Sequence, residues 1–179
     1  MDTWLNNTIM MNKEILSEFN ETTNELIGIL SSLNLDQLNT VPFEGSWTAG
    51  QVGHHLLKSY GIAAILQGNT IETKRPVNEK INHIRSMFND HTIKMESPEF
   101  ILPTDKRIEK EKLLESLAEK INQVRLFAEQ NHDLSLTCLD FDLPGAGSLT
   151  RSEWIQFMSI HTQRHIRQLK KIVEYLLNV

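Results

Sequence analysis

The sequence is poor in the features that mark several large classes of protein. It contains one cysteine, Cys138, so an intrachain disulfide is excluded and an intracellular setting is expected. No run of about 18 apolar residues occurs, so we expect no membrane-spanning helix and no membrane partner. Lys and Arg number 18 against 23 Asp and Glu and form no long basic run, so we expect no nucleic-acid partner. The N-terminal residues lack a basic segment followed by an apolar run, so we expect no secretory signal and a cytoplasmic protein.

Strand-like segments are also scarce. Runs of Val, Ile and Thr with alternating polarity are missing, and only residues 100–102 and 134–139 are weak candidates. The chain has 179 residues, of which 40% are hydrophobic. This length and composition fit one globular domain, residues 1–179, with a core of its own.

Helical periodicity dominates the rest of the chain. Four segments have apolar residues at spacings of three and four, which is typical of helices that bury one face. They are residues 7–33, 46–67, 109–131 and 150–177, with a shorter helix expected at 80–89. The sequence therefore predicts an all-α fold, a four-helix bundle in which residues 69–107 form a long crossover between the second and third helices.

Sequence signals for helix ends support these boundaries. Thr48 with Gln51, and Thr150 with Glu153, match capping boxes at the starts of the second and fourth helices. Asn34 is a candidate C-cap of the first helix. Residues 69–107 and 132–149 lack regular periodicity, and we expect them to frame any pocket.

The last helix carries two histidines where aliphatic residues are expected. Its inward stripe consists of Trp154, Met158, His161, His165, Gln168 or Leu169, Ile172 and Tyr175. His161 and His165 are four residues apart and therefore stack on one face. A buried imidazole needs partners for its ring nitrogens, and one shared cation would satisfy both residues at once. The pattern thus favours a metal site inside the bundle.

Periodicity selects a third histidine from the pair His54 and His55. His55 shares a helix face with Val52 and Ile62, whereas His54 shares a face with Lys58 and points to solvent or an edge. Three neutral imidazoles, from His55, His161 and His165, suit Zn²⁺ or Ni²⁺, with Fe²⁺, Co²⁺ and Mn²⁺ as alternatives. Three protein ligands leave a position open for water or substrate, which is typical of a catalytic metal.

The alternative interpretation is structural. Each of these histidines can instead be a hydrogen-bonded core residue. We assign His83, His91 and His132 to the surface, and Cys138 to packing. The basic residues of the last helix, Arg164, Arg167, Lys170 and Lys171, are assigned to its solvated face.

Two motifs resemble the DinB/YfiT superfamily. Trp47-Thr-Ala-Gly-Gln-Val-Gly-His-His55-Leu56 is similar to the opening of that family's second helix. Residues 147–154, Gly-Ser-Leu-Thr-Arg-Ser-Glu-Trp, followed by His161-x-x-x-His165-x-x-Gln168, are similar to its fourth helix. The family places its first metal histidine eight residues after the Trp, which is His55 here, and its other two at His161 and His165. Thr48 and Gln51 stand where the family has Ser and Glu.

The resemblance implies a DinB-like bundle with up-down-down-up topology, often a homodimer, with a divalent cation on the three histidines. It also implies a small-molecule substrate, and some members transfer groups with a low-molecular-weight thiol. We therefore hypothesise a metal-dependent S-transferase that uses a small thiol. The alternatives are a metal-dependent hydrolase, or a non-catalytic bundle that binds a small ligand or a partner.

Overall fold

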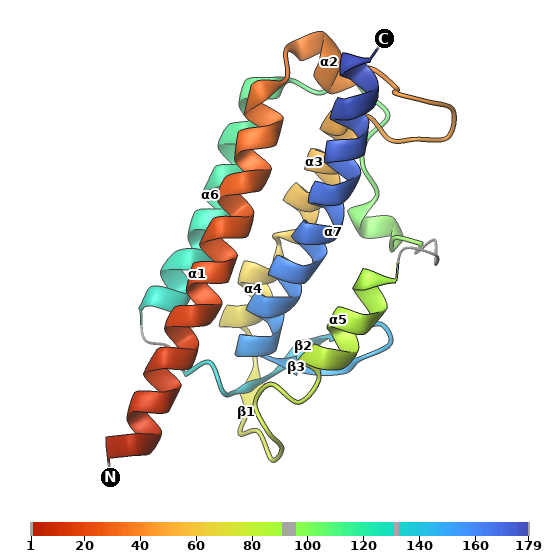
Figure 1. The fold of residues 1–179 in the computed structure, drawn as a ribbon. Helices are drawn as coiled ribbons and strands as arrows, with labels where there is room; N and C mark the ends of the chain where they lie inside the picture. The colour runs from red at the N-terminus through yellow and green to blue at the C-terminus, as the bar shows by residue number, and fades with distance from the viewer. Residues whose placement is uncertain (1, 91–95, 131–132, 179) are drawn as a thin grey trace.

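Most of the chain is helical, as the periodicity predicts (Figure 1). The computed structural model describes residues 2–90, 96–130 and 133–178, with side chains from residue 10 onward. His91 and His132, predicted to be surface residues, and Asn131, the predicted end of a helix, lie outside the described residues. The longer helices are α1 (Asp2–Ser32), α3 (Ala49–Ser59), α6 (Lys110–Glu129) and α7 (Arg151–Leu177). The shorter ones are α2 (Leu35–Asn39), α4 (Ile62–Gln67), α5 (Ile81–Asn89) and the 3₁₀ helix η1 (Glu99–Ile101).

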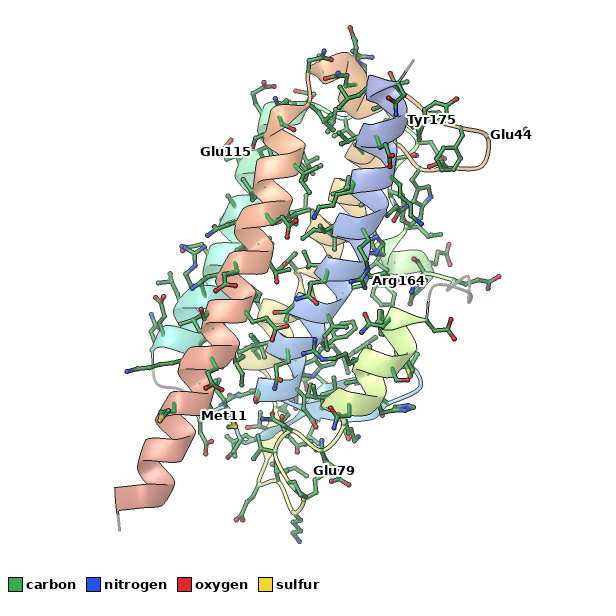
Figure 2. All side chains as sticks on the ribbon, viewed as in Figure 1. Met11, Glu44, Glu79, Glu115, Arg164 and Tyr175 are labelled. Atoms are coloured by element: carbon green, nitrogen blue, oxygen red, sulfur yellow. The ribbon has the colours of Figure 1, made fainter. Side chains whose placement is uncertain are left out.

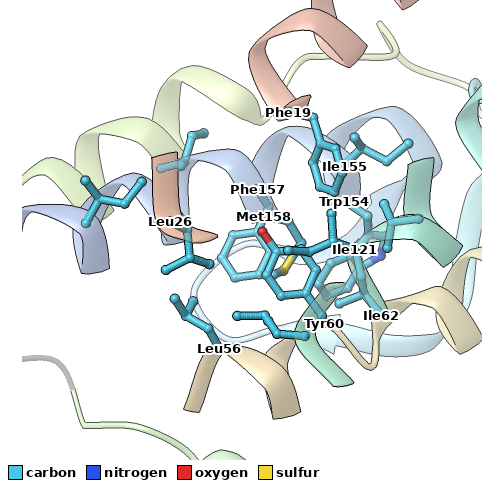
Figure 3. Close-up of a cluster of buried hydrophobic side chains, with 14 of the residues drawn as sticks. Phe19, Leu26, Leu56, Tyr60, Ile62, Ile121, Trp154, Ile155, Phe157 and Met158 are labelled. Atoms are coloured by element: carbon cyan, nitrogen blue, oxygen red, sulfur yellow. The ribbon is translucent and has the colours of Figure 1, made fainter. Parts of the chain in front are cut away.

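The long helices lie side by side and enclose the core. Helix α1 packs against α6 and α7, and α3 packs against the same two helices, whereas α5 packs mainly against α7 (Figure 1). Figure 3 shows aromatic and aliphatic side chains from α1, α3, α6 and α7 meeting in this core, among them Phe19, Leu56, Ile121 and Trp154. Burial of these large apolar side chains, each worth about 1.5–3 kcal/mol, is the main force that holds the helices together.

Gly53 allows α3 to approach its neighbours closely. A Cβ atom at this position would lie 2.9 Å from Leu113 Cδ2 on α6 and 3.2 Å from Leu30 Cδ1 on α1. Both distances are shorter than ordinary carbon–carbon contacts of about 3.5–4.0 Å. A larger residue here would therefore force the buried side chains of Leu113 and Leu30 to shift.

The predicted capping boxes are confirmed. Thr48 Oγ1 accepts a hydrogen bond from the Gln51 backbone N–H at 3.0 Å, and Gln51 Oε1 accepts one from the Thr48 N–H at 3.0 Å. At the start of α7, Thr150 Oγ1 accepts from the Glu153 N–H at 3.0 Å, and Glu153 Oε2 accepts from the Thr150 N–H at 2.9 Å. Each box satisfies two backbone donors that the first turn of a helix leaves without partners.

Two predicted helix ends differ from the structure. Asn34 is not a C-cap: its side chain accepts from the N–H groups of Asp36 and Gln37 and caps the start of α2. The second predicted helix is interrupted at Tyr60 and Gly61, which separate α3 from α4. In a helix interior, glycine is less favourable than alanine by about 1 kcal/mol. Gly61 is therefore a position at which a helix is easily interrupted.

A small antiparallel sheet departs from the all-α expectation. It has the order β1-β2-β3 and comprises Thr70–Ile71, Thr137–Leu143 and Gly147–Thr150. Gly145 and Gly147, with φ of 82° and 70°, allow the turn between β2 and β3. Strand β3 leads directly into α7, so the sheet fixes the start of the helix that carries two of the candidate histidines.

None of the described helices is long and apolar enough to cross a membrane.

Candidate metal centre

Three imidazole rings meet between α3 and α7. His55 projects from α3, and His161 and His165 project from adjacent turns of α7; all three side chains are buried. The Nε2 atom of His161 lies 3.2 Å from Nε2 of His55 and 3.1 Å from Nε2 of His165. The three ligand-capable nitrogens lie within 4.8 Å of one another. Helical periodicity therefore correctly predicts which three histidines lie close together.

Hydrogen bonds at the far side of two rings fix which nitrogen carries the proton. His55 Nδ1 lies 2.9 Å from the carbonyl oxygen of Ile101, and His165 Nδ1 lies 2.9 Å from Gln168 Oε1. Both oxygens only accept, so each Nδ1 must donate its N–H. In a neutral ring the Nε2 atom is then an unprotonated acceptor. Two lone pairs consequently face the Nε2 atom of His161.

On the side away from the cluster, the His161 ring is held by aromatic packing and not by a hydrogen bond. Its ring stacks on Phe157 at 5.5 Å with an interplanar angle of 9°, and the edge of Phe88 contacts it at 5.7 Å. Its Nδ1 atom is buried and has no hydrogen-bond partner among the described residues. A proton on His161 Nε2 can be donated fully to only one of the two facing lone pairs. The cluster is therefore one donor short, and a single cation would satisfy all three nitrogens.

The environment also keeps the three rings neutral, the state in which imidazole binds a metal. Burial lowers the pKa of His161 well below its usual value, and the neighbouring His165 and His55 lower it further. Burial lowers the pKa of His165 to about 3, although the bond to Gln168 opposes the shift. The pKa of His55 is also lowered by burial, against the effect of the Ile101 carbonyl.

These shifts predict that the metal-free protein loses stability in mild acid. The unfolded chain takes up protons on its histidines below pH about 6.5, whereas folded His161 and His165 resist protonation. Their contribution to the free energy of unfolding is therefore fully present above this pH. It is lost as the pH decreases toward the pKa values of the two histidines in the folded protein. When the pH falls from about 7.5 to about 5.5, we expect each of these two residues to lower the free energy of unfolding by about 1.4 kcal/mol.

Urea denaturation of chelator-treated protein at these two pH values measures the loss. In a His161→Phe, His165→Leu double variant both titrating groups are gone. The change in its free energy of unfolding between the two pH values should therefore be about 3 kcal/mol smaller than in the parent protein. An equal pH dependence in the two proteins would contradict the prediction.

The crossover segment around η1 supplies the carbonyl that orients His55. This segment, residues 98–104, is tied along α3 by four hydrogen bonds of 2.6–3.2 Å; they join His55 to Ile101, Lys58 to Leu102, and both His54 and Gln51 to Thr104. In particular, His54 Nδ1 accepts from the Thr104 N–H at 3.1 Å. His54 thus fastens the segment and takes no part in the cluster, as its predicted edge position implies.

A cavity of about 1380 Å³ opens onto the three histidines. Its walls come from α3, α7 and the two irregular segments, as expected for residues 69–107 and 132–149. Many of its lining side chains are aromatic, including Trp47, Phe88, Phe100, Phe141 and Phe157. Trp47 packs at 5.3 Å against the His55 ring. The cavity is large enough for a small organic molecule and apolar enough to exclude much of the water.

The assignments of Arg164 and Arg167 differ from the structure, whereas those of His83 and Cys138 agree with it. Arg164 and Arg167 are half-buried and line the cavity, although the sequence assigned them to a solvated helix face. His83 is exposed, as predicted. Cys138 is buried, and burial raises the pKa of its thiol to about 11, which fits a packing residue.

Sequence reasoning missed a buried ion pair that positions α7. Glu153 has no exposed surface and accepts two hydrogen bonds from Arg75, at 2.8 Å and 2.6 Å. It also accepts from the Lys80 N–H at 2.9 Å, immediately before α5. One carboxylate therefore joins the starts of α5 and α7, which carry Phe88 and His161. The capping-box motif is the only sequence signal for this residue.

Comparison with protein families agrees with this geometry. The sequence matches the family model of the DinB superfamily over residues 18–169. The chain belongs to the DinB superfamily. The matched region contains all three clustered histidines, both capping boxes and Gln168. Comparisons with curated proteins and with solved structures gave no significant match.

Proposed function

We propose that this DinB protein binds a divalent transition-metal ion through Nε2 of His55, His161 and His165. The observation that carries the proposal is the convergence of three buried, neutral imidazoles whose Nε2 atoms lack sufficient donors. Ligands at about 2.0–2.1 Å from a Zn²⁺ ion lie about 3–3.5 Å from one another. Two of the three Nε2 separations, 3.2 Å and 3.1 Å, fit this requirement, and the third lies within 4.8 Å.

We further propose that the long helices form the up-down-down-up four-helix bundle of the family. The packing of α1 on α6 and α7, and of α3 on the same two helices, supports this topology (Figure 1). Residues 68–109, between α4 and α6, form the long crossover. In this arrangement the crossover returns along α3 and delivers the Ile101 carbonyl to His55.

The activity that we propose is transfer of a small thiol to an electrophilic carbon. A divalent cation lowers the pKa of a thiol that it binds. The chain contributes three neutral ligands, hydrogen bonds that orient two of them, and aromatic walls that hold an organic molecule beside them. In the transfer, a sulfur–carbon bond forms, the leaving group departs with the electron pair of its bond to carbon, and the thiol proton passes to solvent.

The proposed activity is tested with a small thiol and chlorodinitrobenzene, from which chloride leaves. Tag-free protein loaded with Zn²⁺ or Ni²⁺ should accelerate thioether formation, and the His161→Ala variant should reduce the rate to that of the uncatalysed reaction. His83→Ala is the matched control, because His83 is exposed and its ring lies beside the Gly145 carbonyl oxygen, outside the cluster. An equal rate in the His161→Ala variant would overturn transferase activity at this site. Chloride release without added thiol would indicate hydrolysis instead.

Gln168 should affect metal affinity without contacting the ion. Its Oε1 atom accepts from His165 Nδ1 and so directs Nε2 toward the cluster. Loss of such an orienting bond typically lowers metal affinity about 10–100-fold. We expect Gln168→Ala to weaken Zn²⁺ binding by this factor in competition with a chromogenic chelator. Gln163→Ala, which removes a side chain bonded to α1, should leave the affinity unchanged.

A further inference from the structure

The described charges around the cavity are mostly positive, in contrast to the net charge of the whole chain. The protein carries a formal net charge of −5. Among the described residues that line the cavity, the basic ones are Lys58, Arg164, Arg167, Lys170 and Lys171, and the one carboxylate is Glu96. An apolar cavity with basic residues around it concentrates anions even when the protein as a whole is acidic.

Two of these five cations already serve the fold. Arg164 projects from α7 toward α5 and donates to the carbonyl oxygens of Phe88 and Asp90 at 2.8 Å and 3.0 Å (Figure 2). Lys170 forms an ion pair with Glu25 of α1 at 2.6 Å. Their charges therefore stabilise the contacts of α7 with α5 and α1.

The other three make no ion pair with a described residue. Lys58 donates to the carbonyl oxygen of Leu102 at 2.6 Å, and Arg167 donates to Asn89 Oδ1 at 2.9 Å, but neither acceptor carries a charge. The Nε atom of Arg167 is buried and has no hydrogen-bond partner in the part of the chain that the structure describes. Lys171 is exposed one helical turn beyond Arg167, on the same face of α7. Positive charges from α3 and α7 thus flank one cavity.

Their spacing along α7 limits the size of a ligand that reaches both the charges and the histidines. At 1.5 Å per residue, Arg167 and Lys171 lie about 3 Å and about 9 Å beyond His165 along the helix axis. This range corresponds to about one or two aromatic rings. The aromatic walls contributed by Trp47, Phe100 and Phe141 lie along the same cavity.

We infer that the cavity selects organic anions, with the acidic group at Arg167 and Lys171 and the apolar body against the aromatic walls. The orientation of the ligand, with its reactive end toward the three histidines, rests on the proposed function. The selection of anions does not. The anionic group is a carboxylate, phosphate or sulfonate, since all three accept hydrogen bonds from guanidinium and ammonium groups.

A pair of fluorescent dyes with the same ring system separates charge recognition from apolar binding. Anilinonaphthalene sulfonate carries the negative charge, and neutral phenylnaphthylamine lacks it. We expect the anionic dye to bind the folded protein more tightly, and an Arg167→Gln, Lys171→Gln double variant to lose at least about tenfold in affinity for that dye alone. Raising NaCl from about 0.05 M to about 0.5 M should weaken the same dye selectively. Small thiols that carry a carboxylate should displace it.

Controls make each outcome decisive. Lys170→Gln makes the same charge change on the same helix at an ion-paired residue and should leave both affinities unchanged. Lys171→Gln alone, at an exposed position, gives a readout if the double variant does not fold. Equal affinity for the two dyes, equal losses in the variants, or no binding of either dye would overturn the inference. Metal content of the same samples reports separately on the proposed function: its absence, with charge selection retained, overturns only the metal proposal.

Discussion

Replacing Arg75 by alanine should lower the free energy of unfolding by about 3–5 kcal/mol. Glu153 is fully buried, and Arg75 is its only cationic partner in the described chain. Removing the guanidinium leaves a buried carboxylate with only the N–H groups of Lys80 and Thr150, and the desolvation of that charge is no longer offset. Urea denaturation followed by circular dichroism at pH 7 measures the loss.

Arg107→Ala provides the matched comparison. Arg107 pairs with Asp36 at 2.7 Å, but the two side chains are 59% and 87% exposed, so this pair should contribute at most about 1 kcal/mol. Similar losses in the two variants would show that the buried pair has no special role. Because Glu153 joins the starts of α5 and α7, Arg75→Ala should also weaken metal binding through the displaced His161 and Phe88.

Saturating metal should raise the melting temperature of chelator-treated protein by about 8–16 °C. A ligand present at about 1,000 times its dissociation constant stabilises the folded state by about 4.1 kcal/mol. For a chain of this size each kcal/mol raises the melting temperature by about 2–4 °C. The gain should be large here because the ion also satisfies a cluster of three converging nitrogens that is one donor short in its absence. Differential scanning calorimetry with Zn²⁺ or Ni²⁺ measures the shift.

The effect should vanish in the His161→Ala variant and persist in His54→Ala. A shift that survives in both variants would mean that the metal binds elsewhere on the protein. No shift in the parent protein with any divalent ion would favour the structural interpretation of the three histidines.

The helices and the three histidines could be predicted because both depend on local spacing. The i, i+4 pair on α7 and the apolar face shared by His55 and Val52 are properties of single helices. The capping boxes at Thr48 and Thr150 depend on residues three apart, and both form as predicted. The resemblance in these same motifs agrees with the family to which the chain belongs.

The features that were missed depend on residues far apart in the sequence. The carbonyl of Ile101 that orients His55 is a backbone group, which no side-chain pattern reveals. The pair of Arg75 and Glu153 joins residues 78 positions apart, and Arg75 lies in an irregular segment. Strand β2 shows no regular alternation of buried and exposed residues, and its pairing with β3 has a register shift, so the period of two was not visible. Arg164 and Arg167 were assigned to solvent because helical periodicity cannot predict that α5 covers that face.

The most direct test of the account is elemental analysis of the tag-free protein, beside His161→Ala and His54→Ala variants, after incubation with Zn²⁺ or Ni²⁺ and removal of free ions. The account predicts about one transition-metal ion per chain in the parent and in His54→Ala, and a loss of most of it in His161→Ala. Absence of metal from all three proteins, or an equal content in all three, would contradict the proposal that His55, His161 and His165 form a metal centre.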